Sequence, residues 1–176
     1  MTEVWDLYDR TRAKTGATML RGEKHPPGGF HLAAEIAVFN GRGEMLIQQR
    51  AFSETSSWSE LWGISAGGAA LQGEDCRQAA ARELREEIGI DIDFSNMNPV
   101  FTIYGEVCFI DYFLVKKDVC IDALQLQKSE VQQVKWATRD EIIKMLRGGE
   151  FVPYYESVIN WLFDMNENGK YGALWK

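Results

Sequence analysis

The chain has 176 residues, of which 45% are hydrophobic, and it carries a formal net charge of −7 with an isoelectric point near 4.9. This length suits one domain with a sizeable core, and the acidic balance argues against non-specific binding to nucleic acid or to an anionic membrane. Three scattered cysteines without metal-ligand spacing, no signal-peptide pattern and no apolar run of membrane length favour a cytoplasmic protein without disulfides.

The first third of the chain predicts β-strands. Two short strands are expected at 4–8 and 16–20, and a proline- and glycine-rich loop follows at 21–30. Two further strands, 32–40 and 44–50, flank the turn at 41–43 as a hairpin-like unit. A serine-rich loop at 51–60 and a short strand at 61–66 then lead into a glycine-rich turn.

Residues 74–88 have the composition of a helix, and Gly89 follows as a C-terminal cap. We expect Glu74 and Asp75 in the first turn, where the helix dipole favours negative charge. Apolar residues recur every four positions and predict a buried stripe made of Cys76, Ala80, Leu84 and Ile88.

Three carboxylates share a second face of this helix. Glu83, Glu86 and Glu87 are related as i, i+3 and i+4, a spacing at which like charges destabilise an isolated helix by a few tenths of a kcal/mol. A helix that gathers them therefore indicates a cation, and carboxylate oxygens suit Mg²⁺ or Mn²⁺. Arg82 can reach Glu86 one turn on and hold its orientation. The alternative is a solvated acidic face with an arginine salt bridge.

The remainder of the chain predicts strands at 100–104, 107–116 and 131–137 and a loop at 117–128. Helices are expected at 139–146, with Thr138 as N-cap, and at 156–165. The tail at 166–176 is expected to be loose, although Trp175 could dock. No repeat or composition break divides the chain, so we expect a mixed sheet with helices on both faces.

Residues 68–90 contain the pattern G-x5-E-x7-R-E-U-x-E-E-x-G-U without a mismatch, where U is a bulky aliphatic residue. This pattern resembles the Nudix box, the signature of metal-dependent hydrolases that cut a diphosphate linked to another group. The resemblance extends over roughly 4–165. It implies a single Nudix domain over 1–176, an α/β/α sandwich with a mixed β-sheet, in which strands and a loop at 1–30 precede the box and a tail at 166–176 ends the chain.

The resemblance also implies roles for the residues of the box. In the family, glutamates at the positions of Glu83, Glu86 and Glu87 bind divalent ions, and the arginine at the position of Arg82 orients one of them. Water attacks a phosphorus in line, and the ions neutralise the phosphate oxygens and lower the pKa of the water. The general base is expected to be Glu87 or Glu130. Glu130, in the segment EVQQVKW, could equally be an extra metal ligand or a solvated strand-end carboxylate.

Four other segments resemble the Nudix proteins related to isopentenyl-diphosphate isomerase, namely VWDLYDR, FHLAAEIAVFN, GEMLIQQR and FVPYY. That isomerase carries a catalytic cysteine and a metal-binding histidine where this chain holds Gly67 and Ala69. Because glycine cannot shuttle a proton and the box is intact, hydrolysis of a nucleoside diphosphate derivative or related organic diphosphate is the first hypothesis. An isopentenyl-diphosphate isomerase and a non-catalytic module that senses a nucleotide or diphosphate are the alternatives.

Several residues outside the acidic face are candidates for substrate binding. Arg50 aligns with a family arginine that contacts the diphosphate, and its planar fork suits phosphate oxygens, although an exposed salt bridge is equally expected. Gly67 and Gly68 let the backbone approach a phosphate or metal. His31 lies where the isomerase has a metal ligand and His25 near a second one, but hydrogen bonding at a strand end is the more common role.

The group attached to the diphosphate is left open by the sequence. Trp58, Trp62 and Tyr104 could stack on a nucleobase, although aromatic residues more often pack in a core. The loops at 21–30, 51–60 and 117–128 are expected to choose a small-molecule substrate, with neither nucleic acid nor membrane as a partner. A monomer and a homodimer are both compatible with the sequence.

Overall fold

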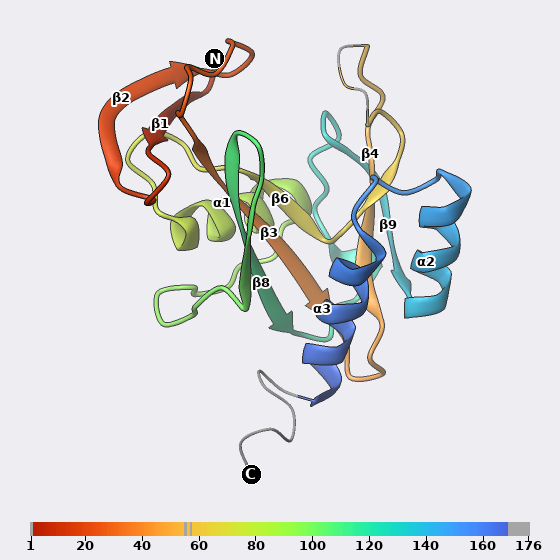
Figure 1. Ribbon diagram of the computed structural model, residues 1–176. Coiled ribbons are helices and arrows are strands. Elements are labelled where there is room, and N and C mark those ends of the chain that lie inside the picture. The colour runs from red at the N-terminus through yellow and green to blue at the C-terminus, as the bar shows by residue number, and fades with distance from the viewer. Residues whose placement is uncertain (1, 55, 57, 169–176) are drawn as a thin grey trace.

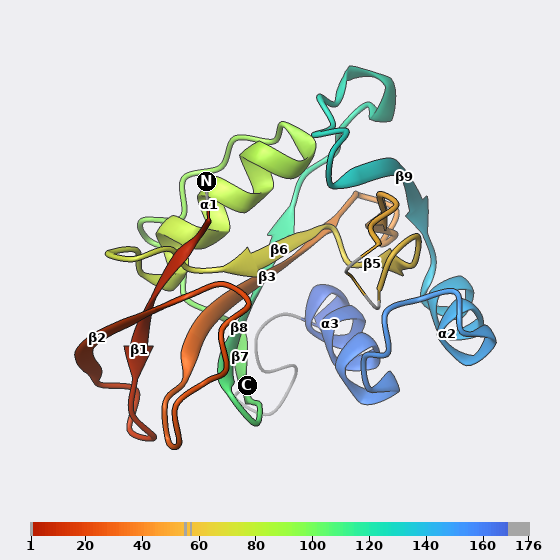
Figure 2. The ribbon, with the colours of Figure 1, turned by 90° about the horizontal axis from the view of Figure 1, so that it is seen from above.

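The computed structural model describes residues 2–54, 56 and 58–168 of the chain. In chain order, the elements are β1 (Val4–Tyr8), β2 (Lys14–Leu20), β3 (His31–Phe39), β4 (Met45–Arg50), β5 (Trp62–Gly63), β6 (Ala66–Ala69), α1 (Cys76–Ile88), β7 (Phe101–Tyr104), β8 (Cys108–Lys116), the short 3-10 turn η1 (Ile121–Ala123), β9 (Val131–Ala137), α2 (Arg139–Gly148) and α3 (Glu156–Asn168). A mixed sheet lies between helices, which confirms the predicted α/β/α sandwich (Figure 2).

Strand β3 forms the centre of the main sheet (Figure 1). It pairs parallel with β8 along its whole length, and β7 extends that side antiparallel to β8. On its other edge, β3 pairs antiparallel with the glycine-rich β6, which brings Gly67 opposite Glu35. Residues 32–39 are apolar except for Glu35, as expected for a strand that is covered on both faces.

The predicted hairpin of β3 and β4 exists only at its turn. Phe39 pairs with Met45, and beyond this pair the two strands separate. Ser65 fills the gap, because its hydroxyl accepts a hydrogen bond from the N–H of Val38 at 2.8 Å and donates one to the carbonyl of Leu46 at 2.6 Å. Strand β4 pairs instead with β9 and β5. The sheet therefore opens toward the C-terminal end of β4.

Helix α1 covers one face of the sheet, and α2 and α3 lie on the other (Figure 2). Alternate residues of β3 point to the two faces and so contribute to two separate cores. The core under α1 contains Ala34, Ile36, Val38, Ala80, Leu84 and Ile88. The core under α2 and α3 contains Ala37, Phe39, Ile142, Ile159 and Phe163. Both faces of β3 are thus buried, which fixes the positions of its polar residues.

A buried ion pair fixes the β1–β2 hairpin to the main sheet. Asp111 of β8 has no solvent exposure, and Arg12 reaches it from the hairpin turn with hydrogen bonds of 3.0 and 2.6 Å. Thr102 donates a further hydrogen bond to the same carboxylate. Because a buried carboxylate without partners is costly, this contact holds the hairpin in one position against the sheet.

The structure corrects two predicted boundaries. The strand predicted at 61–66 is two short strands, β5 and β6, because the chain bends at residues 64 and 65 as it passes from β4 to β3. The last helix continues to Asn168, so the prediction of a loose tail is wrong for residues 166–168. The remainder of that tail, including Trp175, lies outside the described residues. Among helices of the described part of the chain, none is long and apolar enough to cross a membrane.

Candidate active site

Local hydrogen bonds fix both ends of α1. Asp75 is the N-cap and accepts a hydrogen bond from the backbone N–H of Gln78, while the side chain of Gln78 accepts one from the N–H of Asp75. Gly89 ends the helix in the left-handed conformation, with φ of 73°. The helix therefore begins at Cys76, and the prediction that Glu74 and Asp75 lie in its first turn is wrong because both precede it.

Arg82 holds the acidic residues of α1 together. Its Nε and Nη2 bind the two carboxylate oxygens of Glu74 at 2.8 and 2.9 Å, and Nη2 also donates to the carbonyl of Ala69 at 2.9 Å. Its Nη1 binds Glu83 at 2.8 Å and Glu86 at 3.3 Å. The expected contact with Glu86 is present, but it is the longest of the five. Glu74 thus lies beside the turn that precedes the helix and supports it through Arg82.

Glu87 is the most enclosed carboxylate of the helix, with 2% of its surface exposed. Its Oε2 accepts hydrogen bonds of 3.0 Å from the backbone N–H of Gly67 and from Nε2 of Gln48. Burial raises the pKa of Glu87 to about 8, and the charge of Glu83 adds to the increase, although both hydrogen bonds lower it. The fold therefore holds a carboxylate where a charge is costly, which is common at functional sites.

Other carboxylates surround Glu87. Burial raises the pKa of Glu83, and the charges of Glu130 and Glu86 add to this, whereas Arg82 lowers it. Gly68 lies directly against the carboxylate of Glu83, so a Cβ at position 68 would overlap with it. The side chain of Glu86 is 48% exposed. Repulsion among these groups is what a bound cation would relieve.

The residues around Glu87 fit a hard divalent ion. No group of three or more metal-ligating side chains is already arranged to hold an ion among the described residues, and Arg82 engages two of the glutamates. Oε1 of Gln48, a buried acceptor beside Glu87, has no partner within that same part of the chain. Carboxylate and amide oxygens suit Mg²⁺ or Mn²⁺, which usually take one or two carboxylates and complete their coordination with water and substrate phosphates.

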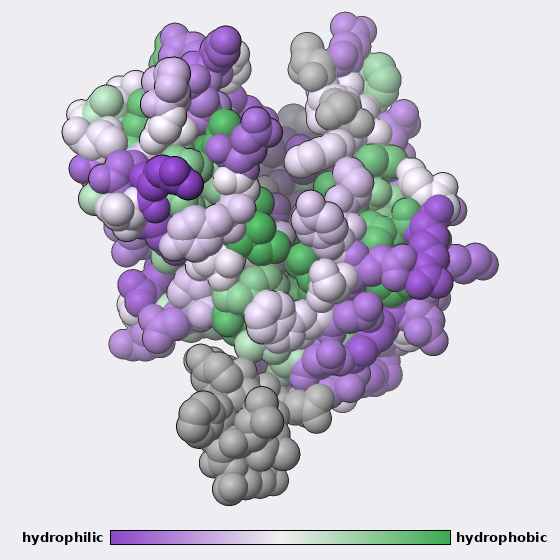
Figure 3. All heavy atoms as spheres, in the orientation of Figure 1, coloured by the Kyte–Doolittle hydropathy of each residue, from purple (hydrophilic) through white to green (hydrophobic). Residues whose placement is uncertain are grey.

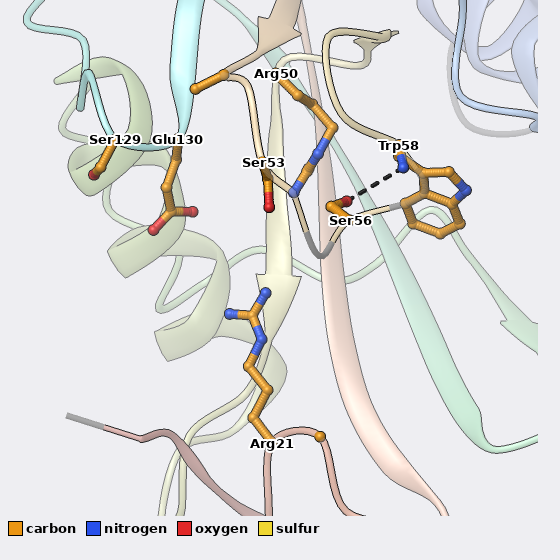
Figure 4. Close-up of a pocket in the computed structure, with 9 residues that line it drawn as sticks. Arg21, Arg50, Ser53, Ser56, Trp58, Ser129 and Glu130 are labelled. Atoms are coloured by element: carbon orange, nitrogen blue, oxygen red, sulfur yellow. Dashed lines mark hydrogen bonds between the residues drawn. The ribbon is translucent and has the colours of Figure 1, made fainter.

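A hollow of about 600 Å³ lies next to these carboxylates, and its lining residues are Arg21, Gly22, Arg50, Ala51, Ser53, Ser56, Trp58, Ser129 and Glu130. Arg50 and Glu130 point into it, and Arg21 approaches from the opposite side (Figure 4). The surface view shows it as a notch between the N-terminal strands and the loop at 51–60 (Figure 3). A ligand in this hollow would contact cationic and acidic groups together.

Arg50 is free to bind a ligand. Within the described residues its guanidinium has no ion-pair or hydrogen-bond partner, so the salt bridge considered as an alternative is not formed there. Arg21, by contrast, pairs with Glu3 at 2.6 Å. The carboxylate of Glu130 accepts one hydrogen bond, from Gln127 at 3.0 Å, and its backbone carbonyl accepts one from Ala51 at 2.7 Å.

Of the three aromatic residues considered for base stacking, Trp58 alone lines the hollow, and it is 48% exposed. Trp62 lies under the ammonium group of Lys135, with 4.5 Å between the nitrogen and the ring centroid. Tyr104 packs edge-on against Phe109. Trp58 is therefore the one of these three residues that lies beside the hollow, where it could stack on a ligand.

His31 makes its contacts with the N-terminal strands and loop. Its ring stacks on Trp5 with centroids 4.5 Å apart, and its Nδ1 lies 2.8 Å from Nε2 of His25. Burial lowers the pKa of His31 to about 4, and the charge of His25 adds to the decrease. The two histidines thus pair with each other rather than with the glutamates of α1. Ala69 supplies no third ligand.

Sequence reasoning missed three residues near the site. Gln48 holds Glu87, and Glu35 lies beside Gly67, where its carboxylate accepts a hydrogen bond from the Tyr154 hydroxyl at 3.1 Å. Glu35 had one available signal, because it is the single acidic residue in an apolar strand. Gln48 had none, since a glutamine near a strand end is unremarkable in a sequence.

Comparison with known proteins agrees with this architecture. A family model described as the NUDIX domain matches residues 29–161. A Listeria monocytogenes protein named as an uncharacterized Nudix hydrolase is 42% identical, over 93% of this chain and 95% of its own length. An isopentenyl-diphosphate Delta-isomerase of Pectobacterium atrosepticum is 30% identical, over 89% of this chain and 88% of its own.

Solved structures share the fold. The crystal structure of DR0079 from Deinococcus radiodurans superposes with a TM-score of 0.75 at 19% identity, and covers 91% of this chain and 99% of its own. An Ap4A hydrolase from C. elegans, solved as a binary complex, superposes with a TM-score of 0.53 at 20% identity, and covers 78% of this chain and 96% of its own. At these identities the likeness concerns the fold alone.

Proposed function

The chain belongs to the Nudix hydrolase family, and we propose that it hydrolyses a diphosphate linkage in a nucleoside diphosphate derivative or related small organic molecule, with Mg²⁺ or Mn²⁺ as cofactor. The observation that carries this proposal is the buried carboxylate of Glu87. It is held by Gly67 and Gln48, and it lies among further glutamates. Beside it lies a hollow with Arg50, whose guanidinium has no partner among the described residues.

In the proposed mechanism, Glu83, Glu86 and Glu87 would hold the ion, which when bound would neutralise phosphate charge and lower the pKa of the attacking water. Arg82 orients Glu83 and Glu86 through its three-way contact with the acidic residues. Because Arg50 has an open guanidinium, it binds the phosphate oxygens. The absence of a Cβ at Gly67 and Gly68 makes room for the carboxylates of Glu35 and Glu83 rather than for the diphosphate itself.

Glu130 is our choice for the general base. A base needs a free lone pair where the water lies, and the carboxylate of Glu130 accepts one hydrogen bond and faces the hollow. Glu87 accepts two hydrogen bonds at one oxygen and is almost unexposed, so it is better suited to hold the metal ion than to accept a proton from water. The water oxygen bonds to phosphorus, its proton passes to Glu130, and the bond from phosphorus to the leaving phosphate oxygen breaks.

Isomerase activity is disfavoured by the surroundings of Gly67. A Cβ at this position would lie 2.9 Å from the backbone carbonyl oxygen of Ala34 and 2.7 Å from Oε2 of Glu35. The site therefore lacks a cysteine and also lacks the space for one. A sensor without catalysis is disfavoured because Glu83, Glu86 and Glu87, the residues proposed to hold the metal ion, are all retained. For location we propose the cytoplasm, which suits three free cysteines, and for assembly a monomer or homodimer.

The test is a hydrolysis assay with Mg²⁺ or Mn²⁺ on nucleoside di- and triphosphates, nucleotide sugars, dinucleotides and prenyl diphosphates. Glu87→Gln serves as the inactive blank, and Glu106→Gln removes an exposed charge as the matched control. We expect turnover of one substrate class that is lost in Glu87→Gln and kept in Glu106→Gln. Turnover that survives in Glu87→Gln, or isomerised prenyl product, would refute the proposal.

A further inference from the structure

Glu35 is a partly buried carboxylate that the proposed mechanism does not use. It lies on β3 in register with Gly67 of β6. A Cβ at position 67 would lie 2.7 Å from Oε2 of Glu35 and 2.8 Å from its Cδ. The carboxylate therefore fills the space that a side chain at position 67 would occupy.

Tyr154 fixes one oxygen of this carboxylate and leaves the other open. Its hydroxyl donates to Oε2 of Glu35 at 3.1 Å. The segment that carries Tyr154 is itself anchored to β5, because Trp62 exchanges backbone hydrogen bonds with Glu150 and Val152. Among the described residues, Oε1 of Glu35 has no hydrogen-bond partner. Because this oxygen is also not buried, it is accessible to a ligand. Glu35 is thus an oriented acceptor with one free oxygen.

This acceptor lies next to the groups that would bind the diphosphate. The N–H of Gly67 donates to Glu87, and the α-carbon of the same residue faces Glu35. The pKa of Glu35 rises to about 7, chiefly through burial, and the charges of Arg50 and Glu83 also act on it in opposite directions. Glu35 is therefore within electrostatic reach of the residues proposed for phosphate and metal binding.

We propose that Glu35, oriented by Tyr154, is a specificity-determining residue that accepts a hydrogen bond from a hydroxyl group on the organic part of the substrate. This inference rests on the proposed diphosphate hydrolysis. A ribose or another sugar next to the diphosphate supplies such a donor. A prenyl chain would set hydrocarbon against the carboxylate and displace the water that otherwise solvates its free oxygen, which costs free energy. The substrates are therefore hydroxylated diphosphates, and prenyl diphosphates are rejected.

The experiment measures dissociation constants by calorimetry in Mg²⁺, together with kcat/KM where turnover occurs. The ligands are ADP, 2′,3′-dideoxy-ADP, ADP-ribose and dimethylallyl diphosphate. The proteins are the unaltered chain, Glu35→Leu, Glu35→Gln and Tyr154→Phe. Tyr155→Phe is the matched control, because the neighbouring Tyr155 is 76% exposed.

We expect the unaltered chain to prefer ADP or ADP-ribose over dimethylallyl diphosphate by at least about 10-fold, the effect of one charged hydrogen bond. The preference should fall about 10-fold in Glu35→Leu, fall less in Tyr154→Phe, and survive largely in Glu35→Gln, which keeps an acceptor oxygen. Weaker binding of dideoxy-ADP assigns the donor to the ribose of the nucleoside. Tighter binding of ADP-ribose alone assigns it to the distal sugar.

An unchanged preference in Glu35→Leu would overturn the inference, as would equal binding of all four ligands by the unaltered chain. If Glu35→Leu does not fold, Tyr154→Phe carries the test, because the preference should fall in that variant too and an unchanged preference there would overturn the inference. Absence of hydrolysis with the binding preference intact would defeat the proposed function and leave the role of Glu35 in ligand selection standing. The two failures are therefore distinguishable.

Discussion

Replacing Glu87 with glutamine should stabilise the fold and abolish activity. Glu87 is 2% exposed, and its surroundings raise its pKa from 4.5 to about 8. Since one pKa unit corresponds to about 1.4 kcal/mol, the ionised carboxylate costs the fold up to about 5 kcal/mol, an upper bound that water entry and relaxation reduce. Glutamine has nearly the same shape, stays neutral, and keeps an oxygen that can accept from Gly67.

The pH dependence follows from the direction of this shift. A carboxyl group whose pKa is raised by folding binds its proton more tightly in the folded chain, so its penalty is absent below about pH 4.5. Stability is then lost as the pH rises toward 8, and the loss is complete above that value. Glu87→Gln lacks this loss. Its advantage over the unaltered chain should therefore be near zero at pH 4.5, grow through pH 7 and become constant above pH 8.

Urea unfolding in EDTA at pH 5 and pH 8.5 measures the effect without bound metal. We expect Glu87→Gln to gain about 2–5 kcal/mol at pH 8.5 and much less at pH 5. Glu86→Gln removes the same charge from the same helix at a side chain that is 48% exposed, and it should change stability by less than about 1 kcal/mol at either pH. The reasoning would be refuted if Glu87→Gln were less stable than the unaltered chain at pH 8.5. It would also be refuted if the gain in unfolding free energy were the same at both pH values.

Three further changes test other contacts. Gly67→Ala should lower the unfolding free energy by about 1–3 kcal/mol, because the new methyl group meets a backbone oxygen 2.9 Å away. In Gly68→Ala the methyl group meets a movable carboxylate, so kcat should fall more than stability. Urea unfolding and steady-state kinetics separate the two effects. Arg12→Met should cost about 3–5 kcal/mol because it leaves Asp111 buried without its charged partner, and a thermal midpoint close to that of the unaltered chain would contradict this. Gln48→Met should lower kcat roughly tenfold with KM little changed, since it removes one of two hydrogen bonds that orient the buried carboxylate of α1; a change confined to KM would count against it.

The family and the fold class were predictable because their evidence is local. The spacing of Gly68, Glu83, Glu87 and Gly89 is written in one continuous segment, and the family model confirms that interpretation. The C-terminal cap of α1, the N-terminal cap of α2 and the bounds of β9 also depend on neighbouring residues only. The catalytic and metal-binding roles of the glutamates stay predictions.

The other parts of the site could not be predicted, because they depend on contacts between distant segments. Glu35 faces Gly67 through the register of β3 against β6, and Tyr154 joins them from a segment far along the chain. Gln48 reaches Glu87 only because β4 leaves β3 after one residue pair, and the hydroxyl of Ser65 bridges the strands there. Hydrophobic periodicity predicts that a strand exists, but its partners and register are set by tertiary packing.

Parallel pairing between β3 and β8 sets the order in which the chain can fold. Every element from β4 to β7, including α1, lies between these two strands in the chain, so the centre of the sheet cannot close until β8 has been synthesised. Contacts this far apart are slow to form, because the intervening chain loses entropy before the pairing compensates for it. The β1–β2 hairpin and α1 are local and can form early, whereas Glu130 reaches the site only when β9 pairs with β4, which also lies far from it in the chain. Recovery of turnover during refolding should therefore lag behind recovery of the helical signal, and enzyme activity would report the last step of assembly.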